Sequence, residues 1–432
     1  IYIMIKYLKQ SLKLIKKDPI LFSYTKKIRF DNISLSSITN NFNQSFHLDF
    51  NNGREYVGIK ECIKYDLNSG QELKSLKNIN FNYIKYGYKN KNLKFFGGVA
   101  FDLNEDFKKP WEGIPKISFL IPEILIEKKK NQYFLSFFKL LNKDSDIDSI
   151  MHDYNLFLKL FKKINNKNNK LEFIKDSPNF YEYEKTFKHI AKHIKNKSIS
   201  KIILSRIKSF STKNKCLIKK ASKNCTNFHF DFDKNKRFLG STPETIIKLN
   251  NMKFRTHALA GTLRKNQNKM KINDFLKNKK ELNEHKFVVD DLLKKLNKFS
   301  DNFNKSDKPE ILELEHLYHL NTPIEGLLKN KTHVLDLLLN LYPTPAVLGK
   351  PSKKAMSLIK NYELNDRGWY GGCIGWFDMN GNGRFDVTIR SALQIKNKLY
   401  CYAGSGLIES ADIEYEWLET ESKFKHLISL IN

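Results

Sequence analysis

Several features that mark well-known classes of protein are missing from this chain. No apolar run approaches the roughly 18 residues that a membrane-spanning helix needs. Neither a G-x-x-x-x-G-K-[ST] phosphate loop nor a G-x-G-x-x-G turn after a strand is present. Nucleotide binding therefore has no support in the sequence, and we expect no membrane partner.

Cysteine is scarce and irregularly spaced. The chain has five cysteines in 432 residues, and no two of them form a C-x-x-C pair. An odd, scattered set is typical of free thiols in a reducing compartment, not of a disulfide framework. The pattern predicts a cytoplasmic location.

Acidic residues are few relative to basic ones, which gives a formal net charge of +30. Such a charge is found in proteins that bind nucleic acids. Lysine and asparagine are frequent almost everywhere here, and no arm or single face concentrates the charge, so we expect no nucleic-acid partner. A non-catalytic basic binding protein is the alternative, and a steep salt dependence of nucleic-acid binding would identify it.

Apolar residues are nevertheless abundant enough for a globular fold, since 41% of the chain is hydrophobic and 13% aromatic. Residues 20–140 alternate short apolar runs with polar turns and predict a sheet-forming half. A stretch rich in Lys, Asn and Asp follows at 142–178, with a helix predicted at 150–164. We divide the chain into 1–178 and 179–432 and expect the two parts to form one intertwined unit.

Strands are predicted in the second part at 201–207, 387–392 and 399–404, and a helix at 181–197. The run 404–406 (Gly-Ser-Gly) has two interpretations. It could present backbone N–H groups to an anion, or it could form a plain tight turn.

Two histidines, a lysine and a glutamate can also be explained without a functional role. His316 and His319 lie three residues apart, but no further His or Cys spacing supports zinc, which favours a structural role. Lys201 opens an apolar strand, and a lysine at a strand end usually reaches solvent. Glu244 follows a proline in GSTPE, where an exposed turn residue would be ordinary.

A long helix predicted from about 272 to 296 carries two carboxylates on its apolar face. Glu281 and Glu284 are three residues apart, and Val288 and Leu292 continue the same face. The pair alone could be solvated near a helix end. Carboxylates that point towards a core are costly unless a cation or strong donors meet them.

The last predicted helix, from about residue 413, repeats this arrangement. Glu416, Glu419 and Lys423 share one face with Leu427. Two inward-facing carboxylate pairs favour a shared divalent cation over two unrelated helix ends. Oxygen-only ligands suit Mg²⁺, which keeps several waters and often bridges to an anionic substrate.

Seven motifs, taken together and in this order, resemble those of the chorismate-utilising enzymes, and among them the isochorismate synthases. They are KIILSR, GSTPE, ALAGT, the E-x-x-E-H of Glu281–His285, YPTPAVLG, IRSA with AGSG, and the E-x-x-E-T-x-x-K of Glu416–Lys423. They cover the chain from about residue 181 to its end. The resemblance implies an α+β fold, with a large two-layered antiparallel β-sheet core, outer helices and the site between the layers.

The activity that the resemblance implies is a Mg²⁺-dependent conversion of chorismate to isochorismate. Water adds at carbon 2 of the ring while the hydroxyl leaves from carbon 4. By resemblance, Lys201 is the general base that activates the water, and Glu244 is the general acid that protonates the leaving group. A carboxyl in that role needs a raised pKa, which desolvation and nearby carboxylates would supply.

The resemblance also implies the binding residues. Glu284 and Glu419 would bind Mg²⁺ directly, and Glu281 and Glu416 through metal-bound water. The substrate-binding residues would be Gly261, Thr262, Ala346, Arg390, Gly404, Gly406 and Lys423. Of these, the two cationic side chains would contact the substrate carboxylates.

Three positions favour isochorismate as the product within this family. Family members that add ammonia, the anthranilate and aminodeoxychorismate synthases, usually carry Gln in place of Lys201, and the latter commonly a lysine in place of Ala260. Salicylate synthases tend to have Thr in place of Ala346. Tyr342, Thr245 and Cys373 depart from the family pattern but remove no catalytic group. A salicylate synthase or an ammonia-adding enzyme is the alternative; no motif fixes the downstream pathway, and we expect a monomer or a weak homodimer.

Overall fold

The computed structural model describes residues 2–29, 34–88, 93–161, 169–219, 224–265, 272–313 and 317–431. Within these ranges, 21 strands pair into one hydrogen-bonded network. The ladders between these strands are antiparallel except that of β1 (Ile20–Ile28) with β4 (Tyr83–Gly87). The network folds over on itself and forms two groups of strands.

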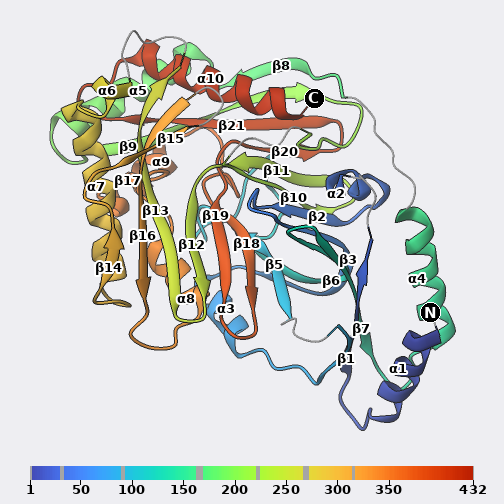
Figure 1. Cartoon of the computed structure of the whole chain (residues 1–432). Helices are drawn as coiled ribbons and strands as arrows, with labels where there is room; N and C mark the ends of the chain where they lie inside the picture. Colours follow the sequence, from blue (N-terminus) through green and yellow to red (C-terminus); the bar gives the residue numbers. More distant parts are fainter. Residues whose placement is uncertain are drawn as a thin grey trace.

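The first group begins at one edge of the network. In order of pairing it contains β8 (Glu172–Ser177), β9 (Lys201–Ser211), β21 (Lys398–Leu407), β20 (Ser391–Ile395), β11 (Lys236–Thr242), β10 (Thr226–Asp233), β2 (Ser45–Asp49) and β3 (Arg54–Leu67). Figure 1 shows β9, β21, β20 and β11 running across the upper part of the molecule.

The second group continues from β3. It contains β6 (Ile117–Lys129), β5 (Lys94–Val99), β18 (Cys373–Asp378), β19 (Gly383–Val387), β12 (Thr245–Asn250), β13 (Lys253–Arg264) and β16 (Leu317–Leu327). In Figure 1, β12, β13, β16 and β19 run steeply across the direction of the first group. Six peripheral strands complete the network: β1 and β4, together with β7 (Gln132–Leu141), β14 (Phe303–Lys305), β15 (Glu310–Glu313) and β17 (Gly349–Lys350).

The largest hydrophobic core lies between the two groups. Phe238 and Tyr402 of the first group, and Phe96 and Phe377 of the second, belong to the same buried cluster. Trp369, which is completely buried, packs edge-on against Phe238. The strands from residues 1–178 do not stand apart, because β2 pairs with β10 and β5 pairs with β18.

Helices cover the outside of the sheets. They are α1 (Tyr2–Lys13), α2 (Leu35–Ile38), α3 (Gly70–Ser75), α4 (Ile147–Phe161), α5 (Phe180–Lys195), α6 (Ile272–Phe275), α7 (Lys279–Leu296), α8 (Val334–Leu341), α9 (Ser352–Tyr362) and α10 (Ile413–Ile431). In Figure 1, α5 and α10 lie over β21, α7 lies beside β13 and β16, and α1 and α4 occupy a separate corner. No helix in these ranges is both long and apolar enough to cross a membrane.

The predicted helix at 272–296 is interrupted, which corrects the sequence prediction. After α6 ends, the Asn278 side chain accepts a hydrogen bond from the Glu281 backbone N–H at 3.2 Å. An asparagine in this role starts a new helix, because its oxygen satisfies one of the first, otherwise unpaired N–H groups. Both glutamates consequently lie in the first two turns of α7, not in the middle of a longer helix.

The predicted strand at 387–392 is also wrong as a single element. β19 ends at Val387, β20 starts at Ser391, and Arg390 between them has a φ of 49°, in the left-handed region. The left-handed conformation departs from the extended backbone of a strand, and here the chain turns from one sheet group into the other. Conversely, Gly404–Gly406 forms no turn, because it lies within the regular ladder of β21 with β9.

Candidate active site

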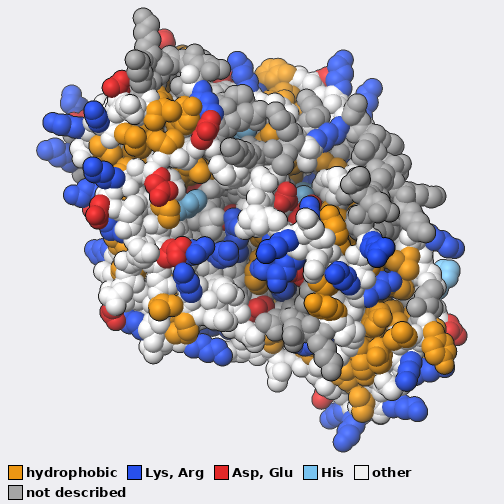
Figure 2. Space-filling view, in the orientation of Figure 1, with side chains coloured by type: hydrophobic (Ala, Val, Ile, Leu, Met, Phe, Trp, Pro, Cys, Tyr) orange, Lys and Arg blue, Asp and Glu red, His pale blue; other side chains and the backbone are white. Residues whose placement is uncertain are grey.

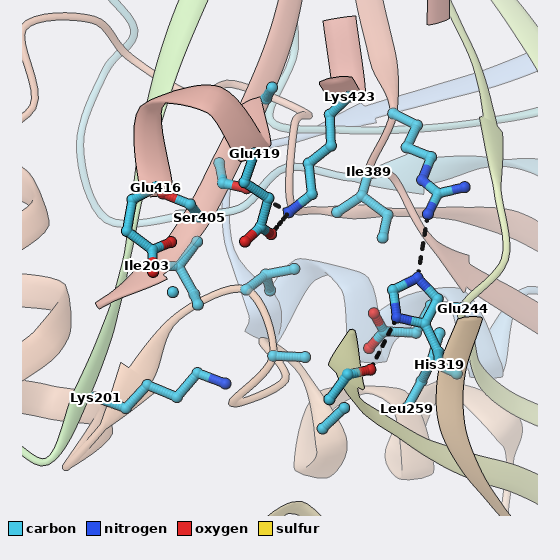
Figure 3. A pocket seen from close by; sticks show the side chains of 18 of the residues that line it. Lys201, Ile203, Glu244, Leu259, His319, Ile389, Ser405, Glu416, Glu419 and Lys423 are labelled. Carbon is cyan, nitrogen blue, oxygen red and sulfur yellow. Dashed lines mark hydrogen bonds and ion pairs between the residues drawn. The ribbon is translucent and has the colours of Figure 1, made fainter. Parts of the chain in front are cut away.

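The predicted site residues meet around one cavity of about 190 Å³. Those whose side chains the structure describes all line it, although they come from strands, loops and two helices far apart in the chain. Thr262 follows Gly261 in β13, and its side chain lies outside what the structure describes. Figure 3 shows Glu416, Glu419 and Lys423 of α10 on one side of the cavity, Lys201 below them, and Glu244 with His319 opposite.

Lys201 points into the cavity and does not reach out to solvent. Its side chain is only 12% exposed, and its ammonium forms a short ion pair with Glu284 of α7. The neighbouring strand makes room for it at Gly406, where an added Cβ would lie 3.2 Å from Lys201 Cε. Glycine is therefore favoured at position 406 on steric grounds, because a larger side chain would press on Lys201.

Glu244 lies in the tight connection between β11 and β12 and is 7% exposed. Its Oε1 accepts a hydrogen bond from Thr344 Oγ1 at 3.2 Å. Burial raises the pKa of Glu244 to about 7, although the Thr344 hydrogen bond and the charge of Lys201 pull it down. The expected raised pKa is thus present, and desolvation is its main cause. The carboxyl can hold a proton near neutral pH.

This raised pKa predicts a pH-dependent stability. The folded-state pKa of about 7 exceeds the ordinary 4.5, so the Glu244 contribution is fully present below pH 4.5 and is lost as pH rises through 7. Glu244→Gln stays neutral, so its stability relative to wild type should increase by about 3 kcal/mol between about pH 5 and pH 9. Urea denaturation at both pH values measures this. Glu112→Gln, at an exposed position, is the control, and an equal response of both variants would contradict the assignment.

The cationic side of the cavity is built by α10 and by the turn before β20. Lys423 Nζ lies 2.6 Å from Glu419 Oε1 and donates a hydrogen bond to the Gly404 carbonyl at 2.7 Å. Arg390 is 7% exposed, and its left-handed backbone places it at the cavity wall. A buried guanidinium and an ammonium beside an open cavity are suited to binding carboxylates.

His319 of β16 is a site residue whose part the sequence analysis missed. Its Nδ1 lies 3.1 Å from the Gly261 carbonyl, and its Nε2 lies 3.3 Å from Arg390 Nη2. A carbonyl only accepts and a guanidinium only donates, so Nδ1 carries the proton and Nε2 accepts. Burial and the charge of Arg390 lower the pKa of His319 to about 3. The neutral ring therefore orients Arg390; His316, the other predicted histidine, lies outside the described residues.

The carboxylates of the site supply the type of donor that Mg²⁺ binds. Glu281 and Glu284 of α7 and Glu416 and Glu419 of α10 face the same cavity. Within the described ranges, no three His, Cys, Asp or Glu side chains stand together as a metal-binding group. Glu284 is paired with a lysine, as is Glu419. The oxygen donors fit the ion, and each of these two ion pairs involves the Oε1 atom of its carboxylate.

Comparison with known sequences points to one family. Residues 7–432 match the family model described as chorismate binding enzyme. The chain is 28% identical over 348 residues to the isochorismate synthase MenF of Bacillus subtilis (strain 168), which covers 78% of this chain and 74% of that protein. It is 38% identical over 190 residues to the salicylate biosynthesis isochorismate synthase of Pseudomonas aeruginosa, covering 43% of this chain and 40% of the relative.

Solved structures show the same fold. The menaquinone-specific isochorismate synthase MenF of Escherichia coli superposes with a TM-score of 0.80 at 21% identity, over 99% of each chain. Anthranilate synthase component I of Streptococcus pneumoniae gives 0.66 at 17% identity, over 93% of this chain and 92% of that one. The predicted α+β architecture with an antiparallel double-layered core is confirmed. By its sequence from residue 7 onwards and by its fold, the chain belongs to the chorismate binding enzymes.

Proposed function

We propose that this protein is an isochorismate synthase, an isomerase that converts chorismate to isochorismate. The observation that carries the proposal is the pairing of Lys201 with a buried, protonatable Glu244 across one cavity, beside the cationic Arg390 and Lys423. Several relatives named isochorismate synthase support the same reaction. The names of similar proteins mention menaquinone, salicylate and vibriobactin, which are different products. The proposal therefore concerns the reaction and not the pathway.

The two titratable groups divide the proton transfers. Lys201, once it has parted from Glu284 and lost its proton, accepts a proton from the water that attacks carbon 2. Glu244 donates its proton to the hydroxyl that leaves carbon 4 as water. One water molecule enters and one leaves, so the ring keeps its composition. General acid and general base groups each typically contribute about 10²–10⁴-fold to the rate.

The remaining polar groups bind and orient the substrate. Arg390, fixed by the neutral His319, and Lys423 would contact the carboxylates of chorismate. We propose that Glu284 and Glu419 bind Mg²⁺ directly and that Glu281 and Glu416 act through metal-bound water. When bound, the ion would neutralise charge on the ring carboxylate of the substrate.

The side chain at position 346, in the cavity wall, should decide whether the product is isochorismate or whether pyruvate is then eliminated to give salicylate. Ala346 lines the cavity and offers only a methyl group, whereas threonine would add a hydroxyl that can bind the substrate or a water. A tenfold change in partition needs only about 1.4 kcal/mol. Ala346→Thr should therefore raise the ratio of pyruvate to isochorismate, measured by a lactate-dehydrogenase-coupled assay beside chromatography. Wild-type protein that already yields salicylate and pyruvate stoichiometrically would instead be a salicylate synthase.

We further propose that the enzyme acts in the cytoplasm as a monomer or a weak homodimer. None of the five cysteines forms a disulfide, as expected in a reducing compartment. Size-exclusion chromatography with light scattering at several concentrations tests the oligomeric state.

A further inference from the structure

A second cleft, separate from the active site, is strongly cationic. Its volume is about 420 Å³, and it shares no lining residue with the catalytic cavity. The described residues of its lining include no carboxylate, and the basic ones are Arg54, Lys129, Lys130, Lys248, Lys253, Arg255 and Arg384. Basic side chains cover much of the surface in Figure 2, so charge alone does not distinguish the cleft. The arrangement of these basic residues in the sheet distinguishes the cleft from the rest of the surface.

Three cationic residues stand in a row across adjacent strands. Arg255 of β13 is directly opposite Lys248 of β12, and Lys248 is directly opposite Arg384 of β19. Directly opposed residues of antiparallel strands place their side chains on one face, and like charges there destabilise the sheet. Burial and the charges of Arg384, Arg255 and Arg54 all lower the pKa of Lys248. An unliganded protein therefore bears a repulsion in this row.

Carboxylates around the cleft compensate only part of this charge. Arg384 Nε lies 3.1 Å from both oxygens of Asp386. Glu325 is shared by Arg255, at 2.7 Å, and Lys253, at 3.1 Å. Among the residues that the structure describes, the other four basic side chains of the cleft have no ion pair with a carboxylate.

Two aromatic side chains, Phe50 and Trp376, make the lining of the cleft partly apolar. Phe50 is 5% exposed, and its ring centroid lies 4.3 Å from the guanidinium carbon of Arg384. Trp376, opposite Arg384 on β18, is 7% exposed, and its indole N–H has no hydrogen-bond partner among the described residues. The volume lies within the range of small-molecule sites, roughly 300–1,000 Å³.

We propose that this cleft binds a small polyanion, a metabolite that bears phosphate groups or several carboxylates. Its oxygens would lie against the row of Arg255, Lys248 and Arg384, where guanidinium and ammonium donors bind both kinds of anion. The negative charge of the ligand would compensate the positive charge that the nearby carboxylates do not, and would so relieve the repulsion within the row. Flanking contacts would come from Arg54 and Lys129, which are themselves opposed across β3 and β6.

Calorimetric titration of the full-length protein in Mg²⁺-free buffer, with inorganic tripolyphosphate and with citrate separately, tests the proposal. The double variant Lys248→Gln/Arg255→Gln should weaken binding about tenfold or more for each charge-assisted hydrogen bond that it removes. The control Lys331→Gln/Lys354→Gln removes the same charge from exposed positions and should bind like wild type. Tighter binding of tripolyphosphate or of citrate identifies the class of anion.

Equal weakening by both double variants would reduce the effect to general electrostatics and overturn the proposal. It would also be overturned if neither anion bound, or if only a single-stranded oligonucleotide did so through the cleft. A second readout needs no ligand, because Lys248→Gln should raise the Tm by relieving the like-charge row, and a lowered Tm would contradict that claim. Chorismate turnover enters none of these measurements, so their failure would leave the proposed function untouched.

Discussion

Lys201→Ala should form isochorismate about 10²-fold or more slowly than wild type, with an unchanged far-ultraviolet circular dichroism spectrum. The lysine is the base candidate because its ammonium projects into the cavity and is held there by Glu284. Among the described residues that line the cavity, the other lysine is Lys423, which is engaged with Glu419 and Gly404.

The chain offers a matched control for this experiment. Lys350 lies directly opposite Lys201 in the ladder of β17 with β9, but it does not line the cavity, and its Nζ stacks over Phe287. Lys350→Ala should leave turnover close to that of wild type. Wild-type turnover in Lys201→Ala, or an equal loss in both variants, would remove Lys201 from the mechanism.

Replacing either proposed metal ligand should have a comparable effect. Glu284→Gln and Glu419→Gln should each lower Mg²⁺-dependent turnover by more than about 10²-fold, because a bound cation stabilises charge by several kcal/mol. Each substitution keeps the shape of the side chain and removes one negative charge. Glu414→Gln on the exposed side of α10 is the control and should be nearly neutral.

The metal itself can be tested without any variant. Protein passed through gel filtration in excess EDTA should be inactive and should regain activity when Mg²⁺ is added. Calorimetry with Mg²⁺ alone should show binding to wild type and weakened binding to the Glu284→Gln variant. Activity that persists in EDTA would exclude a metal role, whatever the variants show.

Periodicity within single helices predicted the two carboxylate pairs of the site, whereas Lys201, Glu244 and most substrate-binding residues came from the resemblance to the chorismate-utilising enzymes. The i, i+3 spacing of Glu281 with Glu284 and of Glu416 with Glu419 placed each pair on an inward face, and the structure brings both pairs to one cavity. The last helix was predicted from about residue 413, and α10 begins at Ile413. Local patterns of this kind are visible in one stretch of sequence.

What the sequence did not reveal depends on pairing between distant segments. His319 enters the site because β16 pairs with β13 and brings its ring to Gly261, and no local signal distinguishes it from a core histidine. The link between Lys201 and Glu284 joins residues 83 positions apart. The turn at Arg390 interrupts a run whose composition is that of a strand, because tertiary structure overrides local propensity there.

Incubation with chorismate and Mg²⁺ in ¹⁸O-labelled water, followed by liquid chromatography and mass spectrometry, tests the central claim most directly. We expect isochorismate that carries one solvent oxygen at carbon 2, in the absence of pyruvate and, when ammonium is added, in the absence of anthranilate. Unlabelled isochorismate would contradict the attack of water activated by Lys201. A product of any other kind, or none, would contradict the assignment of the reaction.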